Sequence, residues 1–320
     1  MRRFQDYVPR GVIPAILLAF KDDYSIDWAD TRKHLRDVAA VQGLSAVTVN
    51  GHASEVSSCA FDEQRALLEA TVDEIGDRLP VISGVYADGS FEAARLARMM
   101  DQAGASALLV FPSYSLAMGG QLRPEMAVAH FKGIADVTDL PLICFQYPER
   151  SNVSYPLDML LTLVDAVPSI RAIKDWCNDP MLHEKHIRTL QTLPHPVNVL
   201  TTHSSWLMAS LTLGCNGLLS GSGSVMADLQ TALWRAVQAN DLAKAKAIND
   251  RIYPLAHAFY APPFLDMHNR MKEALVLLGR IKRAVVRPPL MKLSEAELAR
   301  IGQAIDVAGL SADGALDLVA

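Results

Sequence analysis

Cysteine is scarce in this sequence, which has only four among its 320 residues. They are widely spaced and include no Cys-x-x-Cys pair: Cys59, Cys144, Cys177 and Cys215. This spacing excludes the motifs that are built on paired cysteines. We therefore expect four thiols that act as small buried hydrophobes in a reducing compartment.

Long hydrophobic runs and an excess of basic charge are also missing. The apolar run Val12–Phe20 is too short to span a bilayer and is interrupted by Pro14. The charged residues 1–11 lack the apolar core of a signal peptide. A formal net charge of −5 gives no basic footprint for nucleic acid. We expect a cytoplasmic protein whose partners are neither membranes nor nucleic acids.

What the sequence does have is a short apolar run followed by a longer amphipathic stretch, repeated eight times. The runs are Val12–Phe20, Ser45–Asn50, Val81–Val85, Ala107–Phe111, Leu142–Tyr147, Ile170–Trp176, Val197–Thr202 and Cys215–Ser220. Each has the length of a strand, and most are apolar on both faces, as buried parallel strands are. The alternation predicts a (β/α)8 TIM barrel.

The alternative fold is a doubly wound sheet, which needs a glycine-rich dinucleotide turn after its first strand. No such turn follows Phe20. Beyond Asn240 the strand pattern stops, and three helices are expected at Leu242–Phe259, Asn269–Leu278 and Ser294–Val307. We therefore expect a barrel over residues 1–240 and a C-terminal helical extension over residues 241–320, packed on the barrel.

Lys174 is the most informative residue. It lies near the end of the sixth run, and strand alternation puts it on the same face as Ala172 and Trp176. If that face points into the barrel, the lysine loses hydration and its pKa falls. A neutral amine attacks a ketone to form an imine, which serves as an electron sink. A lysine that reaches solvent or pairs with a carboxylate suits the same position, and the strand alone favours neither reading.

Three further features have both a functional and a structural reading. The glycine-rich segment Ser220–Ser224 has the composition of an anion cradle, but a tight turn is favoured because glycine serves turns in general. His183 and His186 are three residues apart on a helix, where a metal pair is possible but a solvated outer face is expected. Glu55 is expected to brace a loop rather than to act as a base.

Six short motifs occur in order near the ends of the expected strands or before the last helix. They are Val-Asn-Gly-His-Ala-Ser-Glu at 49–55, Phe-Pro-Ser-Tyr at 111–114, Tyr-Pro-Glu-Arg-Ser-Asn at 147–152, Ala-Ile-Lys-Asp at 172–175, Leu-Gly-Cys-Asn-Gly at 213–217 and Arg-Pro-Pro-Leu at 287–290. Together they resemble the dihydrodipicolinate synthase and N-acetylneuraminate lyase family of lysine-dependent aldolases and lyases. The resemblance runs from Gly11 to about Leu310.

The resemblance implies a barrel with a C-terminal helical extension, assembled as a homotetramer (a dimer of dimers). It implies a Schiff base between Lys174 and a 2-keto acid, often pyruvate. The carboxylate-binding turn of the family matches Gly51-His52-Ala53. Tyr114 matches a tyrosine that reaches the site of the neighbouring subunit. Arg150 matches an arginine that meets the carboxylate of a second substrate in the synthase branch.

The sequence departs from the family at two important places. His52 and Ala53 replace two hydroxyl residues of the carboxylate-binding turn, so that only the backbone N–H groups remain. Phe145 stands where the family has a proton-shuttling tyrosine. Tyr147 lies two residues further on the same strand face, about 7 Å away. We expect Tyr147 or His52 to take over proton transfer, although Tyr147 also suits plain packing at the barrel mouth.

The region after the seventh run also differs from the family. Ser204 and Ser205 stand where the sugar-lyase branch carries an acidic pair and the synthase branch an acidic residue. We therefore expect neither of these two activities. His203 and Trp206 are expected at the mouth of the barrel with His52 and Phe145, which favours a less polar or aromatic partner aldehyde.

The sequence thus predicts a Schiff-base carbon–carbon or carbon–oxygen lyase or aldolase that acts on a 2-keto acid, without metal or cofactor. The expected catalytic residues are Lys174, Tyr147 and Tyr114, and the expected substrate-binding residues are Gly51, His52, Ala53, Phe145, Arg150 and Ser220. A 2-keto acid dehydratase or deaminase, and a binding or regulatory protein that has lost catalysis, remain open alternatives. A metal-dependent lyase needs a pair of carboxylates, and Asp175 alone is too few.

Overall fold

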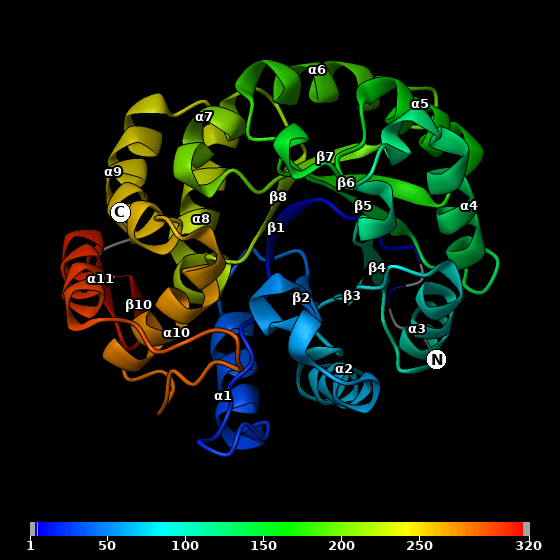
Figure 1. Cartoon of the computed structure of the whole chain (residues 1–320). Helices are drawn as coiled ribbons and strands as arrows, with labels where there is room; N and C mark the ends of the chain where they lie inside the picture. Colours follow the sequence, from blue (N-terminus) through cyan, green and yellow to red (C-terminus); the bar gives the residue numbers. More distant parts are fainter. Residues whose placement is uncertain (1–3, 5, 316–320) are drawn as a thin grey trace.

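A ring of eight parallel strands forms the centre of the computed structural model, which describes residue 4 and residues 6–315 (Figure 1). The strands are β1 (Gly11–Pro14), β2 (Val47–Val49), β3 (Val81–Val85), β4 (Ala107–Val110), β5 (Leu142–Gln146), β6 (Ile170–Asp175), β7 (Asn198–Thr201) and β8 (Gly217–Ser220). The hydrogen-bonded order runs from β2 through β3 to β8 and then to β1. A parallel bridge between Ala15 and Thr48 connects β1 to β2 and closes the ring. The predicted (β/α)8 barrel is confirmed.

Eight helices surround the strands, one after each strand (Figure 1). They are α1 (Trp28–Ala39), α2 (Phe61–Ile75), α3 (Ser90–Gln102), α4 (Pro124–Ala135), α5 (Leu157–Ala166), α6 (Pro180–Leu190), α7 (Leu207–Thr212) and α8 (Gly223–Gln238). Local capping fixes where several of them begin. The carboxylates of Asp27 and Asp179 accept hydrogen bonds from the first turns of α1 and α6, and Pro180 takes the first helical position of α6.

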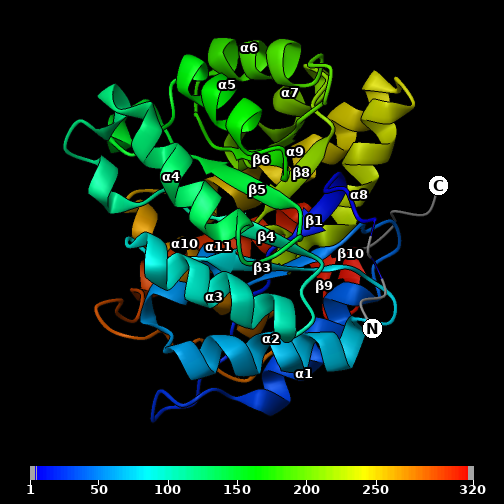
Figure 2. The same ribbon diagram turned by 90° about the vertical axis from the view of Figure 1, so that its right-hand side faces the viewer.

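Three more helices form the C-terminal extension on one side of the barrel (Figures 1 and 2). They are α9 (Leu242–Phe259), α10 (Met267–Leu277) and α11 (Glu295–Ala308). Helix α9 packs on α8, α11 packs on α9, and α10 also contacts the turn that follows β2. A short hairpin of β9 (Leu310–Ser311) and β10 (Gly314–Ala315) follows. The expected C-terminal helices are present, and they bring α10 to the barrel mouth.

The strand residues are buried almost throughout, which explains why the runs are apolar on both faces. Inward side chains fill the barrel and outward ones pack under the helices, so that the whole forms one continuous core. No helix among the described residues combines the length and apolar character that crossing a membrane requires.

Candidate active site

Lys174 comes from β6, whose alternation directs it into the barrel while Asp175 points outward to the helices. Its side chain is buried, and among the described residues it makes no ion pair. Burial lowers its pKa from 10.5 to about 7. About half of such a group is neutral at pH 7, against roughly one in a few thousand for a free lysine side chain. The nucleophilic form is therefore well populated.

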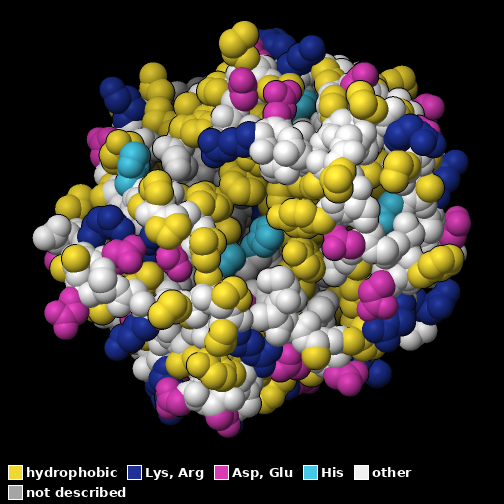
Figure 3. Space-filling model, in the orientation of Figure 1, with side chains coloured by type: hydrophobic (Ala, Val, Ile, Leu, Met, Phe, Trp, Pro, Cys, Tyr) yellow, Lys and Arg dark blue, Asp and Glu magenta, His cyan; other side chains and the backbone are white. Residues whose placement is uncertain are grey.

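A small cavity lies over Lys174 at the carboxyl ends of the strands. Its walls are mainly apolar and aromatic: Ala15, His52, Ala53, Phe145, Trp176, Thr202, Gly221, Tyr260, Phe264, Met267, His268 and Met271. Lys174 is the only Lys, Arg, Asp or Glu among the described residues that line it. Figure 3 shows the hollow near the middle of this face, bordered by hydrophobic and histidine side chains. The site thus combines one amine with apolar surroundings.

The turn after β2 supplies backbone donors to this cavity. Residues His52–Ser54 form a single 3-10 turn that begins after Gly51. Among the described residues, the backbone N–H groups of His52 and Ala53 have no hydrogen-bond partner. Such free N–H groups bind anions well. The hydroxyl side chains of the family turn are absent, but its backbone donors are present.

Glu55 holds this turn in place, which agrees with its expected bracing role. Its backbone is left-handed, with φ of 52°. One carboxylate oxygen accepts from Lys272 of α10, and the other accepts from the Arg287 backbone N–H at 3.0 Å. Lys272 also lies over the Phe20 ring, 4.4 Å from its centroid. The extension thereby positions the turn through a buried ion pair.

His52 and Tyr147 are hydrogen-bonded to each other through Nε2 and Oη. Burial lowers the pKa of His52 to about 3 and raises the pKa of Tyr147, so both groups are neutral near pH 7. A neutral imidazole and a neutral phenol in contact form a pair that passes a proton in either direction. The two residues that we expected as alternatives therefore lie in contact at one place.

Phe145 faces Lys174, with its ring centroid 4.1 Å from Nζ. Aromatic contacts connect this ring to Tyr147 at 4.7 Å and to Phe111 at 5.3 Å between centroids. The face of a phenyl ring attracts a cation. Phe145 therefore offers the nitrogen a stabilising surface in place of the hydroxyl group that the family tyrosine would provide.

His268 is a site residue that the sequence reasoning missed. It enters the cavity from α10, is buried, and stacks on His52 with ring centroids 6.1 Å apart. Burial holds its pKa well below the usual value, so it is a neutral imidazole. No sequence signal pointed to it, because only the folded chain brings α10 to the barrel mouth.

Five of the expected site residues lie outside the cavity lining: Gly51, Tyr147, Tyr114, Arg150 and Ser220. The Tyr114 side chain is exposed on the segment after β4. Arg150 is also exposed, on the loop after β5. Ser220 is buried at the end of β8, where its hydroxyl group bonds to Ser204 and Ser222 at 3.2 and 2.9 Å. Their expected roles stay predictions.

The expectation that His203 and Trp206 line the mouth is wrong, and Thr202 lines the cavity instead. The His203 ring turns to the helix side of β7, where its Nε2 accepts from the Asn178 N–H at 3.0 Å. It stacks on Trp206 with centroids 4.2 Å apart. The bond from the Asn178 N–H and the stack on Trp206 hold the ring on this side, away from the mouth.

The expectation of a solvated face at His183 and His186 is also wrong. Both are fully buried, and each Nδ1 contacts Asp175 Oδ2, at 2.8 and 2.9 Å respectively. The cause is Asp175, a carboxylate buried beneath α6 that requires polar partners. These residues form a polar cluster outside the cavity over Lys174.

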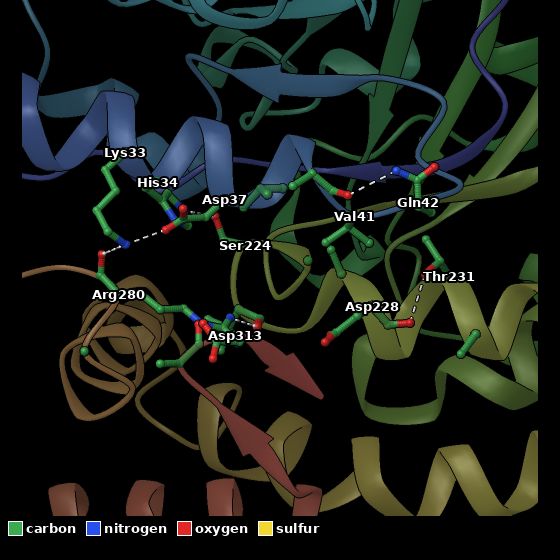
Figure 4. Close-up of a pocket in the computed structure, with 18 of the residues that line it drawn as sticks. Lys33, His34, Asp37, Val41, Gln42, Ser224, Asp228, Thr231, Arg280 and Asp313 are labelled. Carbon is green, nitrogen blue, oxygen red and sulfur yellow. Dashed lines mark hydrogen bonds and ion pairs between the residues drawn. The ribbon is translucent and has the colours of Figure 1, made fainter. Parts of the chain in front are cut away.

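A larger groove lies outside the barrel between α1 and α8 (Figure 4). Its lining includes acidic and basic side chains, and two of the basic ones interact with neighbouring residues of the chain. Lys33 pairs with Asp37 at 2.6 Å, and Arg280 donates to the Val225 carbonyl at 2.6 Å. This groove lacks the excess of one charge that would select a ligand.

The chain matches the Dihydrodipicolinate synthetase family over residues 8–308. It is 27% identical over 301 residues to 4-hydroxy-tetrahydrodipicolinate synthase of Neisseria meningitidis serogroup B, covering 94% of this chain and 99% of that one. It is 26% identical over 294 residues to YagE of Escherichia coli K12, a putative 2-dehydro-3-deoxy-D-gluconate aldolase, covering 91% and 94% of the two chains.

Solved structures agree with this match. The fold is similar to that of YagE from E. coli K12 in complex with pyruvate, with a TM-score of 0.84, 25% identity and coverage of 93% and 98% of the two chains. It is also similar to a dihydrodipicolinate synthase from Thermotoga maritima, with a TM-score of 0.85, 22% identity and coverage of 95% and 99%. The chain therefore belongs to the dihydrodipicolinate synthetase family.

Proposed function

We propose that the protein is a pyruvate-using lyase or aldolase that works through an imine on Lys174. The observation that carries the proposal is the buried amine of Lys174 in an apolar cavity, with its pKa lowered to about 7. The free N–H groups of His52 and Ala53 are hydrogen-bond donors that would bind the keto-acid carboxylate. Family membership and the pyruvate complex of YagE support the same substrate class.

The proposed reaction begins when neutral Lys174 attacks the carbonyl carbon of the keto acid. Uptake of one proton from water and loss of a water molecule give a protonated imine, whose positive charge lies next to the Phe145 ring. The Tyr147–His52 pair takes the proton from the hydroxyl group of an aldol substrate, and the carbon–carbon bond breaks to give an aldehyde and an enamine. Protonation of the enamine and hydrolysis release pyruvate and regenerate Lys174.

We further propose that the group joined to the pyruvyl part is apolar or aromatic. Trp176 and Phe264 stack at the mouth, with centroids 4.9 Å apart, and Met267 and Met271 complete this wall. A polyhydroxylated or carboxylated group loses its hydration in such surroundings without gaining a charged partner. An aromatic aldehyde buries its surface there at no such cost.

Borohydride reduction in the presence of pyruvate tests the mechanism. We expect a mass increase on Lys174, located by peptide mass spectrometry, and no increase in Lys174→Met. The matched control is Lys33→Met, which removes an exposed lysine on α1 and leaves the adduct unchanged. If no 2-keto acid traps on Lys174, the imine mechanism is wrong and a binding role gains support.

A panel of aldehydes offered with pyruvate tests the substrate class. We expect aromatic aldehydes to give a higher kcat/KM than glyceraldehyde or aspartate semialdehyde. A preference for the polyhydroxylated or carboxylated aldehydes contradicts the assignment of the apolar wall, while leaving the imine mechanism intact.

A further inference from the structure

A polar cluster lies between β6, α6 and the end of β7, outside the cavity over Lys174. Figure 1 shows where these three elements lie in the barrel. Its members are Asp175 at the end of β6, Cys177 just after it, His183 on α6 and His203 just after β7. All four are buried, and one ligand atom from each lies within 4.8 Å of the others. Proteins bury such groups together only when they pair closely or hold a metal.

The ligand atoms of these four residues lie close to one another. Asp175 Oδ2 lies 2.8 Å from His183 Nδ1, and Cys177 Sγ lies 3.6 Å from His203 Nε2. Oxygen, nitrogen and sulfur ligands at about 2.0–2.3 Å from zinc in a tetrahedron are about 3.3–3.8 Å apart. Small adjustments of four side chains are enough to reach that geometry.

Surrounding residues orient these groups as they do in metal sites. His203 Nδ1 lies 3.0 Å from the Thr201 hydroxyl, which itself donates to Ser210 at 2.9 Å, so that Nε2 is the lone-pair side and faces Cys177. His186 contacts Asp175 Oδ2 at 2.9 Å and holds the carboxylate. Metal-binding histidines and carboxylates regularly have such outer partners.

Two histidines in or beside the cluster use only one of their ring nitrogens for hydrogen bonding. The Nε2 atoms of His183 and His186 are buried and have no hydrogen-bond partner among the described residues. The opposite ring atom of each histidine, Nδ1, faces Asp175, so His183 would bind an ion in the cluster through Nδ1. The Asn178 N–H occupies the lone pair of His203 Nε2 at 3.0 Å, and a bound metal would replace this bond and the contact between Asp175 and His183.

We propose that Asp175, Cys177, His183 and His203 bind one zinc-type divalent cation. A carboxylate, a thiolate and two neutral imidazoles balance the charge of the dication, so the buried site is neutral overall. Binding releases the thiol proton and any proton held between Asp175 and His183.

The proposed site is structural because four protein ligands leave no open position for water or substrate. It would join the end of β6 to α6 and to the segment after β7. Asp175 is adjacent to Lys174, and the two side chains point to opposite faces of β6. The bound ion would therefore fix the strand that carries the reactive amine without entering the catalytic cavity.

Metal analysis of the full chain, refolded with Zn²⁺ and then dialysed, tests the proposal. We expect one zinc per chain and a higher Tm than in the chain refolded with a chelator. Cys177→Ser should bind at least about tenfold more weakly. The matched control Cys59→Ser removes a free thiol elsewhere and should keep the full zinc content.

Cobalt substitution keeps the test decisive if Cys177→Ser does not fold. Co²⁺ in the wild-type chain should give a thiolate charge-transfer band and the visible spectrum of a tetrahedral ion. An octahedral spectrum without the thiolate band overturns the proposal, and so does a chain that retains no zinc and shows no change in Tm. Either negative result would show that the cluster is an Asp–His hydrogen-bond network only.

Discussion

At the scale of single residues, the site depends on keeping titratable groups uncharged by burial. Lys174 has a lowered pKa because water is excluded, and no acid offsets this among the described residues. His52 is neutral for the same reason. The charge states of these groups are therefore set by burial away from water rather than by ion pairs.

The first prediction concerns pH. The amine of Lys174 must lose its proton to attack, and its lowered pKa is about 7. We expect kcat/KM to rise tenfold per pH unit below about pH 7 and to level off above it. His52, with a pKa of about 3, should add no step between pH 5 and pH 9. If kcat/KM instead keeps rising up to pH 10, Lys174 has the pKa of an ordinary exposed lysine and the prediction is wrong.

The second prediction concerns proton transfer. Tyr147→Phe removes the hydroxyl group that contacts His52 and should lower kcat by about 10²–10⁴-fold. Trapping of pyruvate on Lys174 should persist, because imine formation does not need the bond-breaking step. Tyr253→Phe, on the exposed face of α9, is the matched control and should leave kcat unchanged. Unchanged turnover in both Tyr147→Phe and His52→Ala would remove this pair from the mechanism.

At the scale of elements, the sequence was enough to place Lys174 and the turn at 51–53. The strand runs were apolar and regular, so alternation put Lys174 on one face with Ala172 and Trp176, and the family resemblance favoured the inward direction that the cavity lining shows. The inward face of α6 was misjudged, although the pattern contained the signal. His183 and His186 share a helical stripe with Ile187 and Leu190, which are buried.

The residues that the sequence reasoning missed come from contacts between distant segments. His268 lies 216 positions after His52, and no local periodicity connects the two. The direction of the His203 ring depends on the Asn178 N–H, a backbone group on another loop. Such features depend on the packing of the folded chain, which no window of the sequence contains.

The third prediction concerns the ion pair between α10 and the turn after β2. Glu55→Gln leaves Lys272 buried without its partner and should lower the free energy of unfolding by about 3 kcal/mol. It should also raise KM for pyruvate, because Glu55 positions the N–H donors of His52 and Ala53. Urea denaturation and steady-state kinetics measure the two effects.

The matched control for this variant is Glu69→Gln. It breaks an exposed pair with Arg65 on α2 and should change the free energy of unfolding by less than about 1 kcal/mol. Equal losses in the two variants would show that the Glu55 pair has no special structural role.

At the scale of the whole molecule, the segment after β4 presents an apolar surface. Tyr114 is 57% exposed, Met118 98%, Leu122 84% and Met126 42%. A cluster of large exposed apolar residues is typical of an interface with another protein. It includes Tyr114, the residue for which the family resemblance implies a role in the neighbouring subunit.

The fourth prediction is that this surface joins copies of the chain. Sedimentation equilibrium should give the mass of a homotetramer, built as a dimer of dimers. Leu122→Glu, which places a charge on the surface, should shift the mass to a smaller species, and Phe91→Glu on the exposed start of α3 is the control. A wild-type chain that stays monomeric would exclude Tyr114 from the site of a second subunit.

The contribution of α10 to the barrel mouth has a consequence for how the protein becomes active during synthesis. Strand β6 is made early, but His268 and Lys272 leave the ribosome almost 100 residues later. Without α10 one wall of the cavity over Lys174 is missing, and an amine that water reaches keeps a pKa closer to the ordinary value. We therefore expect the neutral form of Lys174 to become well populated only after α10 has docked on the barrel.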